Sequence, residues 1–369
     1  MKERIKKTIK SNHFLLAIAL LFFASILFFA VPEFFSSGFS YENGVPQKEE
    51  PKKKTIVYSP YDKLIYDAKL LELANNPPPT PPPATQDTAP QTPSKPNLWP
   101  VKTAYPNAGA ILPFKRVVAY YGNLYSKKMG ALGEYPEDEM LSRLMSEVTK
   151  WSTADPKTPA LPALHYIAVV AQASPGERGL YRSRMPGSEI EKVLKMAEKI
   201  NGIVFLDVQV GLSNLQAELP ALEKYLSLPQ VHLGIDPEFS IKTDSRPGKI
   251  IGTFDAVDIN YATNYLAKLV KENNLPPKIF VIHRFTQKMV TNYKLIKQLP
   301  EVQIVMDMDG WGPKAKKIGT YKSFIYPEPV QFTGFKLFYK NDTLELGTVL
   351  FSPEELLKLR PIPIYIQYQ

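Results

Sequence analysis

Two carboxylates close together in the chain are the first candidates for chemistry. The run VHLGIDPE at residues 231–238 alternates, so a strand here places Leu233 and Ile235 on one face and Asp236 and Glu238 on the other. Carboxylates at the end of a buried strand are costly to desolvate unless they meet water, a substrate or a cation. At ~3.3 Å per residue the two lie ~6.6 Å apart along the strand, and neighbouring carboxylates push their pKa values apart. Glycosidic hydrolysis requires such a pair, one protonated and one ionised.

Other apolar runs end in polar residues as well, while their first residues are apolar. The polar residues at these ends are Tyr120 and Tyr121, Asp207 and Gln209, His283 and Arg284, Asp307 and Asp309, and Lys336 and Tyr339. We expect Glu238 to be the general acid/base, Asp236 its partner, and Asp207 or Asp307 the second essential carboxylate. The alternative is a structural network in which these acids pair with Arg284, Lys336 and His283.

Further side chains are candidates for binding a substrate. Aromatic faces stack on sugar rings, and arginines clamp carboxylates or phosphates. The substrate-binding residues predicted on these grounds are Tyr120, Tyr121, Gln209, His283, Arg284, Asp309, Trp311, Lys336, Tyr339, Arg182 and Arg184.

The spacing of apolar runs and helical stretches predicts an α/β fold, a (β/α)₈ TIM-like barrel. Expected strands cover residues 117–122, 165–171, 203–210, 231–238, 278–283, 302–309, 323–326 and 334–339. Expected helices cover 136–151 and 255–272, extend to 298 after the fifth strand, and begin at capping sequences near 188, 213 and 352. Polar residues at the carboxyl ends of several strands are typical of a barrel mouth. An open doubly wound sheet is the alternative, but no Gly-x-Gly-x-x-Gly turn follows the first strand.

The N-terminal part of the chain predicts a membrane anchor and a spacer. Residues 1–13 form a basic tail, and 14–31 are apolar except for Ser25, long enough for a bilayer core. The positive-inside rule keeps the tail cytoplasmic and the C-terminal domain extracellular; a cleaved signal peptide is the alternative. A juxtamembrane segment (32–75) with a short amphipathic helix around Leu64, Ala68 and Leu71 follows. A proline-rich linker (76–112) then leads to the barrel domain (113–369).

Composition excludes several classes of function. The chain has no cysteine, so disulfides, thiolate metal sites and a lipidated cysteine are absent. The net charge of +9 is spread out and accompanies no nucleic-acid-binding motif, so we expect no nucleic-acid partner. No His-x-x-x-His or His-Glu-x-x-His spacing occurs, which argues against a zinc hydrolase. We expect no metal ligands and no cofactor, with a divalent cation as the alternative, and a monomer.

Four short segments resemble an exported, lipoprotein-like bacterial family with a glycosidase-like TIM barrel. They are LGIDPEF at 233–239, PPKIFVIH at 276–283, MDMDG at 306–310 and the closing YQ at 368–369. The resemblance covers the region from about residue 117 and implies export and a barrel. It implies no catalytic residues. The Asp-x-Glu at 236–238 is also similar to a motif of chitinase-like and lysozyme-like barrels, whose longer motifs are missing here.

Three functions fit these observations. The first is a membrane-anchored glycoside hydrolase acting on cell-wall or surface polysaccharide. The second is a metal-assisted phosphodiesterase-type hydrolase that uses oxygen ligands and His283 around a divalent ion. The third is a non-catalytic barrel that binds glycan or another cell-envelope polymer.

Overall fold

A computed structural model describes residues 59–78 and 97–369, and a compact unit spans Thr55–Gln369. The basic tail, the predicted anchor at 14–31 and most of the proline-rich run lie outside the described residues. Within the described residues, none of the helices combines the length and the apolar character needed to cross a bilayer.

Eight parallel strands form a closed ring. In ring order they are β1 (Arg116–Gly122), β2 (Ala160–Ala171), β4 (Ile203–Val208), β5 (Val231–Ile235), β7 (Lys278–Arg284), β9 (Val302–Met308), β10 (Phe332–Leu337) and β11 (Tyr365–Tyr368). Each strand pairs with the next, and β11 pairs with β1, where Val117 lies opposite Tyr365. The structure is therefore a (β/α)₈ barrel, as the sequence predicts.

The predicted strands are wrong at the end of the ring. Residues 323–326 lie in and just after the π-helical turn η6 (Tyr321–Ile325), so the segment predicted as the seventh strand is helical. The predicted eighth strand overlaps β10, which is the seventh, and β11 was missed. β11 is only four residues long and follows two closely spaced prolines, which favour an irregular connection in a sequence-based assignment.

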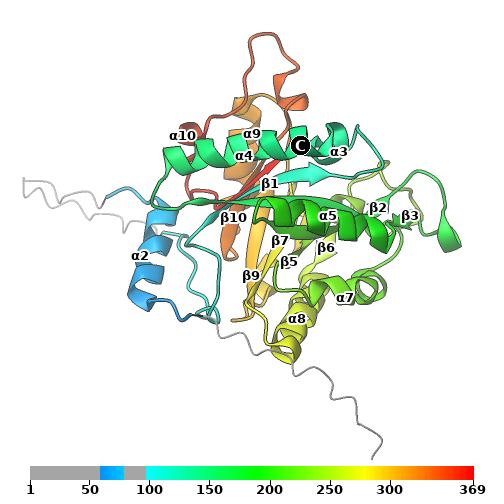
Figure 1. Ribbon diagram of the computed structural model, residues 1–369, viewed down its shortest axis with the longest axis horizontal. Helices are drawn as coiled ribbons and strands as arrows, with labels where there is room; N and C mark the ends of the chain where they lie inside the picture. The colour runs from blue at the N-terminus through cyan, green and yellow to red at the C-terminus, as the bar shows by residue number, and fades with distance from the viewer. Residues whose placement is uncertain (1–58, 79–96) are drawn as a thin grey trace, which may run out of the picture. The chain divides into compact units, whose positions relative to one another are not determined.

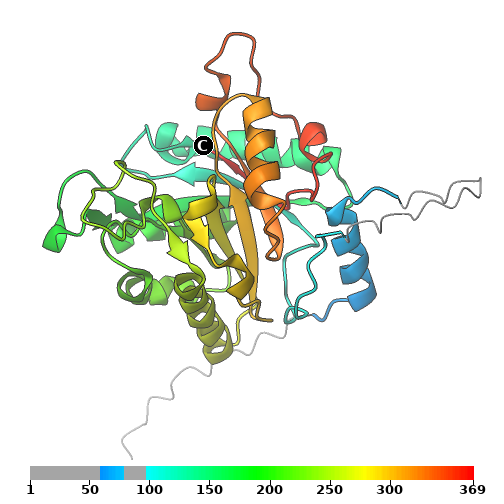
Figure 2. The ribbon, with the colours of Figure 1, turned by 180° about the vertical axis from the view of Figure 1, so that it is seen from behind.

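Helices cover the outside of the ring (Figure 1). The long ones are α4 (Glu137–Ala154), α5 (Gly187–Lys199) and α8 (Ala256–Asn273). The shorter ones are α3 (Ala131–Glu134), α6 (Leu215–Glu218), α7 (Glu223–Leu226), α9 (Lys314–Thr320) and α10 (Pro353–Leu356). From behind, α9 is the orange helix beside β9 and β10 (Figure 2).

The predicted cap at Ser352 is confirmed, because its side chain accepts the Glu355 N–H at the start of α10. The cap of α6 is Asn214, one residue after the predicted Ser213, and α8 follows Asp255, whose side chain accepts the Val257 N–H. The predicted cap at Ser188 is wrong, because α5 begins one residue earlier, after Pro186, and has no side-chain cap. The predicted helix after the fifth strand is also wrong. Its residues form the short turns η4 (Gln287–Met289) and η5 (Tyr293–Leu295) around β8 (Val290–Thr291), which pairs with β6 (Phe254–Asp255).

The strands divide their side chains between two cores, as period-two alternation requires. Outward-facing residues pack under the helices in the larger hydrophobic cluster. Inward-facing residues fill the lower half of the barrel with apolar side chains, among them Val117, Phe205, Val281 and Phe332. Towards the carboxyl ends of the strands the interior becomes polar, and that change places the site.

Helix α2 (Lys63–Ala74) packs against the barrel's lower side, so the compact unit begins well before the predicted boundary at 113. Ile362 N–H donates to Leu73 O at 2.7 Å, and the Trp99 indole N–H donates to Tyr326 O at 2.9 Å. The predicted apolar face of this helix, around Leu64, Ala68 and Leu71, is not the face that is buried. Leu64 and Leu71 are 79% and 63% exposed, whereas Tyr66, Leu73 and Ala74 are buried.

Candidate active site

A cavity of about 460 Å³ opens at the carboxyl ends of the barrel strands. Its walls combine acidic, basic and aromatic side chains from most of the strands. The lining residues are Tyr121, Lys128, Met129, Ile167, Ala171, Gln209, Asp236, Glu238, Phe239, Phe285, Asp309, Gly310, Trp311, Lys316, Thr320, Lys336, Phe338 and Gln369. This is the end of a (β/α)₈ barrel at which active sites form.

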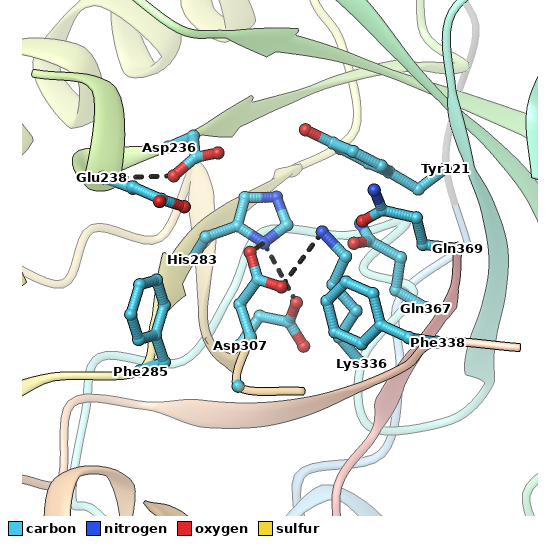
Figure 3. Close-up of polar contacts among 12 residues, drawn as sticks. Tyr121, Asp236, Glu238, His283, Phe285, Asp307, Lys336, Phe338, Gln367 and Gln369 are labelled. Atoms are coloured by element: carbon cyan, nitrogen blue, oxygen red, sulfur yellow. Dashed lines mark hydrogen bonds and ion pairs between the residues drawn. The ribbon is translucent and has the colours of Figure 1, made fainter. Parts of the chain in front are cut away.

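One wall carries the carboxylate pair predicted from the sequence (Figure 3). β5 ends at Ile235, and the next residues turn into η3 (Pro237–Phe239), so Glu238 lies on a turn and not on the strand as predicted. Asp236 caps this turn, because its Oδ1 accepts the Glu238 N–H at 3.1 Å. Gln209 Nε2 donates to the other oxygen of Asp236 at 3.4 Å. Asp236 therefore holds Glu238 at the cavity wall.

Across the cavity, Asp309 and Lys336 form an ion pair of 3.1 Å. The Lys336 ammonium also lies 3.9 Å from the centre of the Tyr121 ring, a cation–π contact. Figure 3 shows Tyr121, Lys336 and Gln369 on the side of the cavity opposite Asp236 and Glu238. Three carboxylates thus line the cavity, Asp236, Glu238 and Asp309, and Asp309 is paired with an ammonium.

Beneath the cavity floor lies a layer of fully buried polar side chains from different strands. His165 Nε2 is 3.4 Å and His283 Nε2 is 3.7 Å from Asp207 Oδ1. His283 Nδ1 is 3.2 Å from Asp307 Oδ2 and 3.3 Å from Asp309 Oδ2. Tyr121, on the cavity wall, donates its O–H to Asp207 Oδ2 at 3.0 Å and so links the two levels.

Two glycines on the strands make room for this layer. A Cβ on Gly234 would lie 2.3 Å from His165 Nε2 and 2.6 Å from Asp207 Oδ1. A Cβ on Gly334 would lie 2.5 Å from an oxygen of Asp307. A side chain at either position would displace the polar groups, so glycine is a steric requirement of the layer.

Burial dominates the electrostatics of the site. Burial, reinforced by Asp309, Asp207 and Glu238, raises the pKa of Asp236 well above its usual value. Burial and the charge of Asp309 also raise the pKa of Glu238, against the opposing effect of Lys336. Both carboxyl groups are therefore biased towards the protonated, proton-donating form.

In the buried layer, burial raises the pKa of Asp307 to about 7 and lowers that of His165 to about 4. The pKa of His283 is lowered too, again mainly by burial. Asp207 differs, because against the effect of burial His165 and His283 lower its pKa. Both imidazoles are consequently neutral at neutral pH, and each then carries one N–H and one lone-pair nitrogen.

The structure brings part of the predicted set together. Predicted residues that line the cavity are Asp236, Glu238, Tyr121, Gln209, Asp309, Trp311 and Lys336. Asp207, Asp307 and His283 do not line it, because they are fully buried in the layer below. The side chains nearest a substrate are thus Glu238 and Asp309 rather than Asp207 or Asp307.

Five predicted binding residues lie away from the cavity and have other partners. Tyr120 and Tyr339 share a hydrogen bond of 2.9 Å on the outer side of the strands. Arg182 and Arg184 both donate to Glu218, at 2.9 and 2.7 Å.

Arg284 points outward from its strand. It pairs with Glu328 at 2.6 Å and donates to backbone carbonyls of the following loop. The predicted network is therefore wrong for Arg284, whose partner is Glu328, whereas His283 does lie beside Asp207 and Asp307.

Several cavity residues have no counterpart in the sequence prediction. Lys128, Phe285, Phe338 and Gln369 are in loops or just beyond strand ends, and Lys316 is in α9, where no pattern marks them as site residues. His165 is not among the residues that the sequence predicts for the site. The alternation of β2, with Ala163 and His165 facing inward, could have placed it in the barrel interior.

Fold and site together define a (β/α)₈ barrel with a polar, carboxylate-bearing cavity at its mouth. No protein-family model matches the chain, and a search of curated proteins found no match. Among solved structures the chain is similar to a ruminal GH26 endo-β-1,4-mannanase, with 13% identity over 69% of this chain and 59% of that one at a TM-score of 0.32. It is likewise similar to the cellulase Cel5C_n (11% identity, 69% and 75% coverage, TM-score 0.37). A third similar structure is Burkholderia cenocepacia dihydropteroate synthase (9% identity, 70% and 86% coverage, TM-score 0.30).

Likenesses this weak carry no conclusion about activity. The matched region also spans only about three fifths of the mannanase. The barrel assignment rests on the closed ring of parallel strand pairs.

Proposed function

We propose that this protein is a glycosidase-like hydrolase whose general acid is Glu238 and whose second carboxylate is Asp309. One observation carries the proposal. Glu238, with its pKa raised by burial and by Asp309, lines the same cavity at the barrel mouth as that second carboxylate. A protonated acid and an ionised partner around one cavity are the groups that glycosidic hydrolysis needs.

The roles follow from the contacts of each carboxyl group. Glu238 gives its proton to the leaving oxygen as the glycosidic C–O bond breaks, and water completes the hydrolysis. Asp309, whose charge is compensated by Lys336 at 3.1 Å, stabilises the positive charge that develops on the sugar ring. Asp236 is a positioning residue, because it holds the backbone N–H of Glu238.

The aromatic side chains of the cavity support a carbohydrate substrate. Trp311 is 49% exposed, and Phe239, Phe285 and Phe338 also line the cavity. Flat apolar rings beside hydrogen-bonding groups suit sugars, which present C–H faces and hydroxyl edges. The volume of about 460 Å³ lies within the range of small-molecule sites.

The setting of the barrel is part of the proposal. Residues 14–31 would anchor the chain in the cell membrane as a single span, with the C-terminal domain outside the cell as a monomer. A net charge of +9 suits an anionic cell-wall or surface polysaccharide as the substrate. Labelling of intact cells with a membrane-impermeant reagent tests this orientation.

The test of the proposed function is the Glu238→Gln variant, assayed on a panel of cell-wall and surface polysaccharides. Loss of the proton donor should lower kcat by about 10²–10⁴-fold. Because Gln has nearly the same shape, the thermal unfolding curve should be nearly unchanged. Glu345→Gln, on an exposed loop, is the matched control and should retain full activity.

Two outcomes contradict the proposal. Unchanged hydrolysis by Glu238→Gln would remove Glu238 as the acid. Glycan binding by the wild-type chain without turnover, equally strong in the variant, would establish a binding barrel instead of an enzyme.

A further inference from the structure

The centre of the barrel brings two imidazole nitrogens and one carboxylate oxygen close together. His165 Nε2, Asp207 Oδ1 and His283 Nε2 come from β2, β4 and β7 and lie within 4.8 Å of one another. All three side chains are fully buried. None of the three atoms has a hydrogen-bond partner among the described residues. Buried polar atoms ordinarily have hydrogen-bond partners, so three atoms without one that converge on a single point require an explanation.

The outer nitrogens of both imidazoles are held by other groups. His283 Nδ1 lies beside the carboxylates of Asp307 and Asp309, at 3.2 and 3.3 Å. His165 Nδ1 lies 2.6 Å from the Tyr365 hydroxyl. In a neutral histidine, an N–H at Nδ1 leaves the lone pair on Nε2. His165 Nδ1 also lies 3.1 Å from the side-chain amide of Gln367, whose oxygen must face Nδ1 for this tautomer. The two lone pairs then point at a carboxylate oxygen, an arrangement that a cation between them would stabilise.

We infer that His165, Asp207 and His283 form a binding site for one divalent cation of the Zn²⁺ class. Two imidazole nitrogens and one carboxylate oxygen are ligands that zinc prefers. Bonds of ~2.0–2.1 Å in a tetrahedron separate ligand atoms by ~3.3–3.4 Å. The observed separations from Asp207 Oδ1, 3.4 Å and 3.7 Å, are close to that value.

The neighbouring groups match those that orient metal-bound histidines. A histidine ligand usually donates its other N–H to a carboxylate or a similar acceptor, which fixes the ring. Asp307 and Asp309 occupy this place for His283, and Tyr365 does so for His165. Gly234 leaves open the space beside His165 Nε2 and Asp207 Oδ1 that a Cβ would fill.

The charge balance of the upper barrel favours a cation as well. Asp207, Asp236, Asp307 and Asp309 are all at most 7% exposed. Among the described residues, one of these carboxylates forms an ion pair with a lysine, and that pair is Asp309–Lys336. Lys317, which is also buried nearby, is paired with Asp342. Asp207 has no lysine or arginine partner within the described ranges, and a divalent ion beside it would offset the charge of this carboxylate.

The first test is metal binding by the full-length, untagged chain after treatment with EDTA and dialysis. We expect one Zn²⁺ per chain by elemental analysis. With free Zn²⁺ at 100 times its Kd, the unfolding equilibrium constant should fall about 100-fold. Mg²⁺ and Ca²⁺, which prefer all-oxygen ligands, should not compete. A folded wild-type chain that binds no Zn²⁺ would overturn the site.

The second test assigns the ligands. Asp207→Asn and His165→Asn should weaken binding by more than about 100-fold, and the supporting Asp307→Asn by about 10–100-fold. His232→Asn is the matched control, because His232 is equally buried but contacts the Ile279 N–H and not the cluster. Glu238→Gln should bind the metal normally, which separates this site from the proposed catalytic acid.

If a ligand variant does not fold, wild-type spectroscopy still decides. The chain has four histidines and no cysteine, so two imidazole ligands in the X-ray absorption spectrum of the zinc-loaded protein identify the site closely. Oxygen-only coordination, or an affinity for Zn²⁺ that is unchanged by Asp207→Asn and His165→Asn, would overturn the inference.

Discussion

Asp236 and Glu238 differ in their surroundings, although only one residue separates them in the chain. Asp236 is 3% exposed and faces the barrel interior, where Asp309, Asp207 and Glu238 all disfavour its charged form. Glu238 is half-buried at the cavity wall and can reach a substrate. The residue with the more strongly raised pKa, Asp236, therefore supports the turn, and the residue on the turn, Glu238, is the proposed proton donor.

The burial of Asp236 predicts a pH-dependent cost in stability. Its pKa is higher in the folded than in the unfolded chain, so ionisation destabilises the fold as pH rises above the ordinary Asp value of about 3.9. Asp236→Asn keeps an oxygen for the Glu238 N–H and should raise the free energy of unfolding at pH 7 by roughly 1–3 kcal/mol. Below about pH 3.9 both states of the wild type are protonated, and the difference should vanish.

Denaturant unfolding of both chains from pH 3 to pH 8 measures this difference. Asp244→Asn, on an exposed loop, is the control and should show no such gain. A variant that is less stable than the wild type at pH 7 would show that Asp236 is stabilised as a carboxylate.

Some of the site could be predicted from single residues and some could not. The alternation of residues 231–236 placed Asp236 in the interior, because a strand with Leu233 and Ile235 facing the helices must turn the other face inward. Nothing local connects His165 with Asp207 and His283, which meet only because β2, β4 and β7 belong to one closed ring. The absence of a short His-x-x-x-His spacing therefore says little about ligands that come from separate strands.

At the scale of the element, β5 shows how one strand makes room for the polar layer inside the barrel. Gly234 lies between His232 and Asp236 on the inner face, level with Asp207 on the neighbouring strand. A residue with a side chain there would fit the propensity of a strand better. The polar layer, not local preference, explains glycine at this position.

Gly234→Ala should therefore destabilise the protein by about 1–3 kcal/mol, the usual cost of overpacking an interior. Its Cβ would meet His165 Nε2 at 2.3 Å and Asp207 Oδ1 at 2.6 Å. Gly319→Ala is the matched control, since an added Cβ in α9 meets nothing within 4 Å and should stabilise by roughly 0.5–1 kcal/mol. Thermal and urea unfolding measure both. Equal stability of Gly234→Ala and the wild type would mean that the layer is loosely packed.

The elements were easiest to predict where both faces of a strand are buried and a capped helix follows. β7 and β9 read as continuous apolar runs, and α8 begins at Asp255 as expected. The prediction of elements was wrong where an element is short or irregular. The π-helical turn Tyr321–Ile325 has the apolar and aromatic composition of a strand, and β11 offers only four residues of pattern.

At the scale of the whole molecule, the barrel is not self-contained from residue 113. Trp99 is 4% exposed and Leu73 is 8% exposed, and both donate or accept hydrogen bonds with the barrel. Leu112, with no exposed surface, exchanges hydrogen bonds with Gln303 at the lower end of the strands. These segments close the end of the barrel opposite the cavity.

A chain that begins at residue 113 should accordingly melt at a temperature lower by about 5 °C or more than one that begins at residue 59. Each buried large apolar side chain contributes about 1.5–3 kcal/mol. A third chain, beginning at residue 97, separates the contribution of α2 to the melting temperature from the contribution of residues 97–112. Differential scanning calorimetry measures all three. Equal melting temperatures would restore the boundary predicted from the sequence.

The register of β1 has a consequence for how the protein is made. Val117 pairs with Leu161 of β2 on one side and with Tyr365 of β11 on the other. The pairing of the first strand of the ring is therefore incomplete until the last strand is present. No nascent chain still lacking β11 can close the ring, however much of it has left the ribosome. Such a chain carries an open sheet in which the free edges of β1 and β10 stay unpaired until the last residues of the ring are available.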